Sequence, residues 1–302
     1  INIHPLGAIS KKTAGTDLSE MYDMQQSGAI AFSDGIHPVQ SAGLVLKALQ
    51  YVKSFEGTII QLPDDTSIGA NGLMNEGIIS TQMGLPGKPI LAEELMVARD
   101  LKLARYANSK IHFTGISSPK SIEYIKRSKE SGIQVTCSIT PYQVYFCDED
   151  LQGYDTNLKL NPPLRTRADM EAIQKALLDG TIDCIASHHL PHHWDNKVCE
   201  FEYARHGMIA LETMFAVLMS CGVTAIDFVQ MQTINVRNIF GLSIPEIKEG
   251  ETASLTLFVP GAAFTYEETM IRSKSKNSPF IGKKLTGKVV GIINKSNIHL
   301  NN

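Results

Sequence analysis

Residues 182–193, IDCIASHHLPHH, join a short apolar run to a loop that contains four histidines. The run at 182–187 is too apolar to face water on either side, so it is predicted to be a buried strand. Similar runs recur along the chain with helix-length spacers between them, which is the pattern of a parallel sheet covered by helices. The other predicted strands are 2–9, 28–34, 58–62, 110–116 and 133–138, and helices are expected at 90–107 and 167–179.

Six strands with helical spacers fit either a doubly wound sheet or most of an eight-stranded barrel. No G-x-G-x-x-G turn follows the first strand, which argues against a dinucleotide-binding fold. The pattern changes after residue 241, where 252–259 and 287–294 are predicted to be antiparallel strands. We therefore predict a (β/α) barrel domain at 1–241 and a small β domain at 242–302.

The composition excludes several classes of partner. The 302 residues are 43% hydrophobic and 20% charged, which is ordinary for an α/β protein with a large core. The net charge is -3 and no long basic run is present, so neither nucleic acid nor an anionic membrane is an expected partner. The five cysteines form no C-x-x-C pair, which indicates reduced thiols and a cytoplasmic location.

The histidine loop is the most conspicuous candidate for chemistry. Catalytic groups of barrel enzymes lie at the C-terminal ends of strands, and neutral imidazole is a favoured zinc ligand. His188, His189, His192 and His193 could therefore bind a metal. The alternative is a polar, partly solvated loop, and the absence of identifiable Asp, Glu or Cys ligands elsewhere favours it.

A second candidate is the stretch 157–165, NLKLNPPLR. Its two prolines fix an extended turn, which could present Asn161 and Arg165 to a small anionic ligand. The same stretch could equally be a loop with a purely structural role.

Several motifs, in the same order, closely resemble the dihydroorotases of the amidohydrolase superfamily. They are N-x-K-x-N-P-P-L-R, D-G-T-I-D-C-I-A with the H-x-P-H loop, G-A-I-A-F-S-D with H-P-V-Q, L-P-G-K-P-I-L-A-E-E-L-M-V-A-R-D and K-N-S-P-F-I-G-K-K-L-T-G-K-V. The likeness runs from about residue 5 to 294. It implies a TIM-like (β/α)8 barrel with a small β-sandwich-like appendage. It also implies an activity in pyrimidine biosynthesis, the hydrolysis and formation of the cyclic amide of dihydroorotate by two zinc ions and an aspartate.

The family's metal ligands, carried over position by position, are replaced in this chain. Dihydroorotases read F-T-D-D-G where this chain reads F-S-D-G-I, which places Gly35 at a metal-binding aspartate. Their Q-H-C-E-D and H-V-Q-H-V-S become Q-L-P-D-D and H-F-T-G-I-S, so Leu62 and Gly115 replace histidine ligands. Their T-D-H-A-P-H becomes S-H-H-L-P-H, which puts His188 at the proton-shuttling aspartate. The resemblance thus implies no metal ligand and no catalytic residue here, and His112, three residues before Gly115, is expected to face the barrel's outer layer.

Asn161, His192, His206 and Gly207 fall where the family contacts its substrate. They could form a vestigial pocket for a small acid, or they could persist because they fix loops. The family's H-x-H-L-R-E-P-G segment would lie before Ile1. We therefore expect a longer natural chain, whose N-terminal strands complete both the barrel and the small β domain.

Three functions follow from this pattern. The first is a non-catalytic subunit that needs no cofactor and assembles with aspartate transcarbamoylase, as related inactive dihydroorotase-like chains do. The second is an active zinc-dependent dihydroorotase that interconverts N-carbamoyl-aspartate and dihydroorotate, with the histidine loop as a rearranged one-metal centre. The third is a sensor that binds these small acids without turnover. Homo-oligomers formed through barrel helices are the family's habit and are a further expectation.

Overall fold

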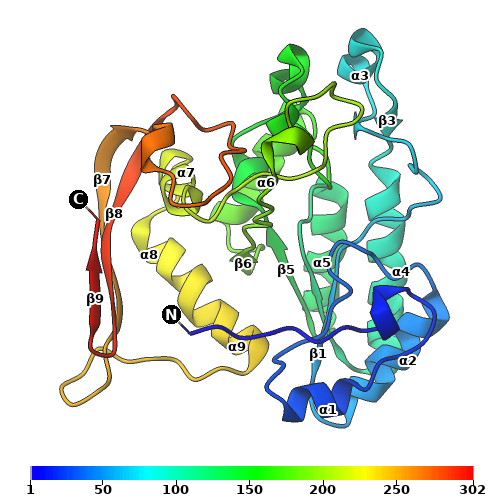
Figure 1. Ribbon diagram of the computed structural model, residues 1–302. Coiled ribbons are helices and arrows are strands. Elements are labelled where there is room, and N and C mark those ends of the chain that lie inside the picture. Colours follow the sequence, from blue (N-terminus) through cyan, green and yellow to red (C-terminus); the bar gives the residue numbers. More distant parts are fainter. Residues whose placement is uncertain (1, 302) are drawn as a thin grey trace.

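The computed structural model describes residues 2–301, and its centre is a parallel sheet (Figure 1). The predicted parallel arrangement is confirmed, because every pairing within this sheet is parallel and helices connect the strands. Neighbouring strands meet at Ile60 and His112, at His112 and Thr136, and at Ser138 and Cys184. The spatial order of the strands is β1 (Thr58–Gln61), β4 (Lys110–Phe113), β5 (Val135–Ile139) and β6 (Cys184–Ile185).

The first two predicted strands lie beside β1 but form only single bridges. Phe32 pairs with Ile59, and Gly7 pairs with Phe32, both in parallel. The buried carboxylate of Asp34 accepts a hydrogen bond from the backbone N–H of Ile9 at 2.8 Å. The N–H group of Ile9 is therefore not available for pairing with a neighbouring strand, which accounts for the short strand pairing in this segment. The completion of the barrel by strands outside this chain stays a prediction.

Four amphipathic helices pack against one another in chain order and cover the sheet (Figure 1). The two helices predicted at 90–107 and 167–179 are both confirmed, within one residue at each end. The fifth helix begins where it does because the Ser118 hydroxyl accepts from the N–H of Ser121 and Pro119 occupies the first turn. The four helices are α2 (Ala42–Lys53), α4 (Leu91–Ala107), α5 (Pro119–Glu130) and α6 (Arg167–Leu178).

A longer helical segment, residues 225–240, packs against β6. It consists of α8 (Ala225–Val229), a π-helical turn at Gln230–Asn235 and α9 (Val236–Phe240). The Gln232 side chain donates to the carbonyl of Ile185 at 2.9 Å, and this bond fixes the helix against the end of β6. One side of this segment therefore faces the ends of the parallel strands.

The C-terminal part forms an antiparallel sheet at one side of the molecule, beside α7 (Met214–Ser220) (Figure 1). Its strands are β7 (Ser254–Thr265), β8 (Lys284–Asn294) and β9 (Asn297–Leu300), in that order. Both predicted strands are confirmed, although within residues 2–301 they belong to a single sheet rather than to a sandwich. Phe258 of β7 packs on Phe215 of α7 with ring centroids 4.8 Å apart. The domain boundary at 241 and 242 stays a prediction.

The remaining elements are short, and none of the helices described between residues 2 and 301 could cross a membrane. They are η1 (Lys11–Thr13), α1 (Met21–Gln26), β2 (Met74–Asn75), α3 (Ile78–Met83), β3 (Gly87–Lys88), η2 (Pro141–Val144), η3 (Asp148–Gly153), η4 (Thr156–Leu158), η5 (Trp194–Asn196) and η7 (Glu268–Met270).

Candidate functional site

A cavity of about 410 Å³ lies at the C-terminal ends of the parallel strands. This is the edge at which barrel proteins carry their sites. Four residues, Gly35, Leu62, Gly115 and His188, stand where the family has its metal ligands and its catalytic aspartate. Gly35, Leu62 and His188 line the cavity. Gly115 lies directly behind His188, since a Cβ at this glycine would come within 2.5 Å of Cε1 of the imidazole. The structure therefore brings the four positions together.

The cavity wall is mostly apolar. Among the described residues, none of those that line it is an aspartate, a glutamate, a lysine or an arginine. Its polar side chains are Ser33, His112, Thr114, Ser138, Asn161, His188, His189 and Gln232.

Five polar side chains, four of which line the cavity, form a continuous chain of hydrogen bonds, which we name the hydroxyl–imidazole relay. It begins with Thr136 Oγ1 and His112 Nδ1, which lie 2.8 Å apart. His112 Nε2 lies 3.1 Å from Ser138 Oγ, and Ser138 in turn lies 3.1 Å from Thr114 Oγ1. The relay ends at His188 Nε2, which is 2.8 Å from Thr114 Oγ1. The polar groups nearest to one another in the cavity thus satisfy each other.

Both imidazoles of the relay are neutral at neutral pH. Burial, assisted by the charge of Lys129, lowers the pKa of His112 to about 3. Burial also lowers the pKa of His188 to about 4. The predicted outward orientation of His112 is wrong, because this residue lines the cavity together with Thr114. The prediction assumed that side chains alternate between the two faces of the strand as far as Gly115. Regular β4 ends at Phe113, so this alternation does not extend to Gly115.

The four histidines of the loop do not converge. His188 belongs to the relay, whereas His189 Nδ1 accepts from two backbone N–H groups at 3.1 and 3.3 Å. His192 Nε2 lies 2.8 Å from the carbonyl oxygen of His206, and His193 is exposed beside an aspartate. Within residues 2–301, no three His, Cys, Asp or Glu side chains gather in a way that could hold a metal ion.

Asn161 lines the cavity, but its amide is bound to an ion pair. Lys88 Nζ lies 2.5 Å from Asp64 Oδ2 and donates to Asn161 Oδ1 at 2.8 Å. The amide nitrogen of Asn161 donates to the same Asp64 oxygen at 3.1 Å. The three side chains form a closed triangle, so the lysine charge is already neutralised next to the cavity.

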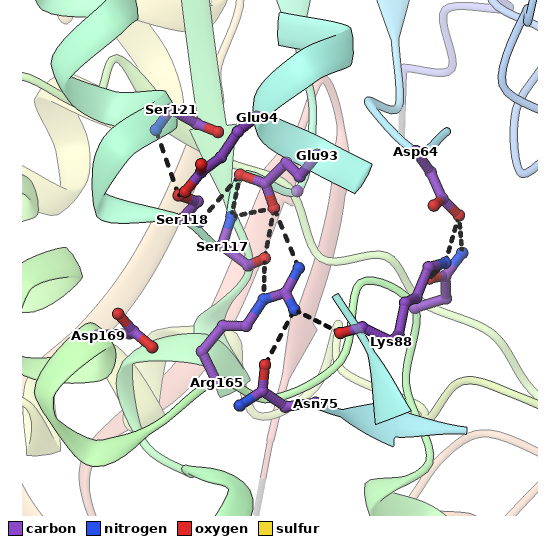
Figure 2. A network of polar contacts seen from close by, with 12 residues as sticks. Asp64, Asn75, Lys88, Glu93, Glu94, Ser117, Ser118, Ser121, Arg165 and Asp169 are labelled. Carbon is purple, nitrogen blue, oxygen red and sulfur yellow. Dashed lines mark hydrogen bonds and ion pairs between the residues drawn. The ribbon is translucent and has the colours of Figure 1, made fainter. Parts of the chain in front are cut away.

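Arg165 does not line the cavity, and its contacts favour the second alternative for the stretch 157–165, a loop with a structural role. Figure 2 shows it inside a network of buried polar groups. Its Nε donates to Ser117 Oγ at 2.9 Å, and its Nη1 donates to Asn75 Oδ1 at 3.0 Å. Its Nη2 lies 3.8 Å from the carboxylate of Glu93, which is itself buried on α4. A buried carboxylate needs a nearby cation, so the arginine stabilises the loop rather than a ligand.

The other predicted substrate positions, His192, His206 and Gly207, do not line the cavity in the described chain. Burial, together with the charge of Lys159, lowers the pKa of His206 to about 4. Gly207 has a φ of +116°, and a Cβ there would lie 2.6 Å from Cβ of Leu190. These residues therefore hold the loop, while their contact with a ligand stays a prediction. Sequence reasoning missed Asp64, Lys88 and Glu93 as partners, although all three stand within or beside the motifs quoted above.

Comparison with known proteins gives the same family by two routes. A model described as "Amidohydrolase family" matches residues 64–298, and one described as "Dihydro-orotase-like" matches residues 1–121. The dihydroorotase of Syntrophus aciditrophicus is 39% identical over 294 residues, which cover 96% of this chain and 69% of that protein. The dihydroorotase of Geobacter metallireducens is 40% identical over 291 residues, which cover 95% of this chain and 69% of that protein.

Solved structures with the same fold have more distant sequences. L-hydantoinase (dihydropyrimidinase) from Arthrobacter aurescens superposes with a TM-score of 0.85 at 19% sequence identity. The superposition covers 99% of this chain and 70% of the hydantoinase chain. A D-hydantoinase superposes with a TM-score of 0.79 at 17% sequence identity, and the superposition covers 97% of this chain and 68% of the D-hydantoinase chain. The predicted amidohydrolase-type barrel with a small β appendage is thereby confirmed, and at these identities the likeness concerns the fold alone.

Proposed function

Because this chain belongs to the dihydroorotase family of amidohydrolases, we propose that it keeps the family's barrel without the family's metal-dependent hydrolysis. In this proposal it serves as a structural or regulatory partner of aspartate transcarbamoylase. The observation that carries the proposal is the chemistry of the side chains gathered at the strand ends.

The donors at the cavity do not fit a pair of zinc ions. Gly35 and Leu62 have no side-chain atom that could coordinate a metal, and the imidazole of His188 lies against Gly115. A protein zinc site uses three or more protein ligands, and a hydroxide near neutral pH requires the metal. The ring nitrogens of His112 and the Nε2 of His188 are already hydrogen bonded within the relay. We therefore assign no hydrolytic step to these residues.

The partner follows from the resemblance rather than from any surface of the molecule. Inactive dihydroorotase-like chains that resemble this one assemble with aspartate transcarbamoylase. A barrel kept over nearly the whole chain, with its metal donors replaced, is compatible with such a scaffolding role. Association of copies of this chain through barrel helices stays a separate prediction.

The proposal is tested by metal content and turnover of the native, full-length protein. The Geobacter metallireducens dihydroorotase, purified in the same way, provides the control for both the metal analysis and the turnover assay. We expect zinc and manganese well below one ion per chain and no conversion of N-carbamoyl-aspartate or dihydroorotate. We also expect co-elution with the transcarbamoylase from the same cell in size-exclusion chromatography. Stoichiometric metal with chelator-sensitive turnover contradicts the first part, and separate elution contradicts the second.

A second candidate is an active zinc-dependent dihydroorotase. The identity of 39 to 40% to curated dihydroorotases favours it, and supports it more directly than it supports an inactive subunit. In this case the histidine loop would have to rearrange around one metal. Replacement of His188 and His189 by alanine would then remove both the zinc and the turnover, whereas the first proposal predicts no metal to lose.

A further inference from the structure

We infer that two neighbouring loops form a docking surface for a second copy of this chain. The first, which we name the tryptophan loop, comprises residues 193–205 and follows β6. The second, which we name the basic loop, comprises residues 272–276 and lies between β7 and β8. In the dimer, the tryptophan loop of each copy contacts the basic loop of the other. This association does not depend on whether the strand ends hold a metal, and it does not use the barrel helices.

The two loops adjoin at one end of the molecule. Asn277, which directly follows the basic loop, is buried and donates to the carbonyls of Leu190 and Gly207, at 3.0 and 3.3 Å, on either side of the tryptophan loop. Its side-chain oxygen accepts from the N–H of His192 at 3.2 Å. Figure 1 shows both loops in the upper part of the view, with the basic loop in orange. A partner that covers one loop therefore also reaches the other.

The tryptophan loop exposes large apolar side chains. Trp194, Val198 and Tyr203 are 64%, 71% and 72% exposed, and Trp194 is the only tryptophan of the chain. Trp and Tyr are enriched among the residues that contribute most to binding at protein interfaces. A covered aromatic side chain buries roughly 150 to 250 Å², compared with ~800 Å² per partner in an interface of standard size. These side chains thus supply a substantial part of the apolar area that a dimer needs.

Two buried lysines hold the tryptophan loop in place. Lys159 Nζ donates to two consecutive carbonyls of this loop, both at 2.8 Å. Lys197 Nζ donates to the carbonyls of Thr156 and Arg205, at 2.8 and 2.7 Å. Because both lysines are buried among described residues, the conformation of the loop is fixed within this part of the chain. A fixed loop loses little conformational entropy on association, so its exposed aromatic side chains are preorganised for a partner.

The two loops carry opposite charges. Glu200 and Glu202 are exposed on the tryptophan loop, whose only exposed arginine or lysine is Arg205. The basic loop, R-S-K-S-K, exposes Arg272 and Lys274 and has no acidic residue. Among the ion pairs within residues 2–301, none involves a side chain named in this paragraph. A twofold axis places the acidic loop of each copy opposite the basic loop of the other, so the contact is made twice. Adjacent loops of opposite charge are therefore self-complementary, which favours a second copy over an unrelated protein.

Complementary charge reversals in the natural, full-length protein test the inference. One variant carries Glu200→Lys and Glu202→Lys, and the other carries Arg272→Glu and Lys274→Glu. Sedimentation velocity at micromolar concentration and low salt should show a dimer of the unchanged protein, since exposed charges are screened least under these conditions. Each variant alone should dimerise at least about tenfold more weakly, because like charges then meet. An equimolar mixture of the two variants should dimerise again, because opposite charges face each other. A monomeric unchanged protein, or a mixture that stays monomeric, overturns the inference.

A second pair of variants locates the contact. Trp194→Ala should weaken the dimer at least about tenfold, whereas Tyr106→Ala, at a side chain that is 76% exposed on α4, should leave it unchanged. The opposite result would place the contact on the barrel helices and overturn the inference.

The accessibility of Trp194 provides an independent readout. Acrylamide quenching of its fluorescence, measured as the difference from Trp194→Phe, should be strong in the dilute monomer and weaken as the dimer forms. Weak quenching in the monomer would show that another segment of the protein covers the loop, which also overturns the inference. None of these measurements depends on metal content or turnover, so their failure is distinguishable from failure of the proposed function.

Discussion

Replacement of Glu93 by glutamine removes one charge from the buried network around Arg165, and the side chain keeps almost the same size. The carboxylate of Glu93 is buried and accepts hydrogen bonds from the N–H groups of Ser117 and Ser118 and from the Ser117 hydroxyl. It is also the first of the carboxylates whose charge acts on the buried guanidinium of Arg165. Figure 2 shows the other partners of this guanidinium, which are the Ser117 hydroxyl, the Asn75 side chain of β2 and the Lys88 carbonyl of β3. The glutamine variant therefore leaves Arg165 without its principal anion.

The magnitude follows from the burial of the pair. Removal of one partner of a fully buried ion pair destabilises a protein by about 3 to 5 kcal/mol. Because Asp169, Asp64 and, with the smallest effect, Glu94 also act on Arg165, we expect the lower end of this range, about 3 kcal/mol. The matched control is Glu94→Gln on the same helix. Glu94 accepts the Ser118 hydroxyl at 2.6 Å, and an amide oxygen can accept the same bond, so its loss should be below about 1 kcal/mol.

Urea titration followed by circular dichroism measures both free energies of unfolding at neutral pH and low salt. The slope of the free energy against urea concentration should remain unchanged, since the same surface is exposed on unfolding. If the two variants differ by less than about 1 kcal/mol, the ion pair does not stabilise the fold in the way argued above.

Two further perturbations concern Gly115 and the buried histidines. In urea titrations, Gly115→Ala should lower the free energy of unfolding by at least about 1 kcal/mol more than the control Gly180→Ala. Both glycines have a positive φ, but only a Cβ at Gly115 would contact His188. Equal losses would show that the imidazole moves away freely. The free energy of unfolding should also fall as the pH drops from about 6.5 towards 4, by about 1.4 kcal/mol per pH unit for each buried histidine. The unfolded chain takes up these protons near pH 6.5, whereas burial keeps His188 and His206 neutral down to about pH 4. His206→Gln should reduce this slope, and an unchanged slope in urea titrations between pH 7 and 4 would assign the effect to other groups.

Much of the fold was predictable because the relevant signals are local. Apolar runs with helix-length spacers predict parallel strands, and the observed β1, β4 and β5 lie within the predicted ranges or extend one residue beyond them. Since parallel strands end at one edge of a sheet, the convergence of Gly35, Leu62 and His188 also followed from the order of the motifs. The absence of donor atoms at Gly35 and Leu62 is a property of the residue types alone.

The partners of the polar side chains were decided only by the tertiary structure. His112 joins residues 24 and 26 positions away, and Arg165 pairs with a glutamate of α4 that is distant in the chain. The four histidines of the loop have different partners, and those of His188, His189 and His192 come from other segments of the chain, whereas His193 pairs with the nearby Asp195. Sequence periodicity reports which side of a strand or helix is buried. Charge pairing and hydrogen bonding inside the barrel depend on which distant segments meet there, and that is why the lining of the cavity had to be seen in three dimensions.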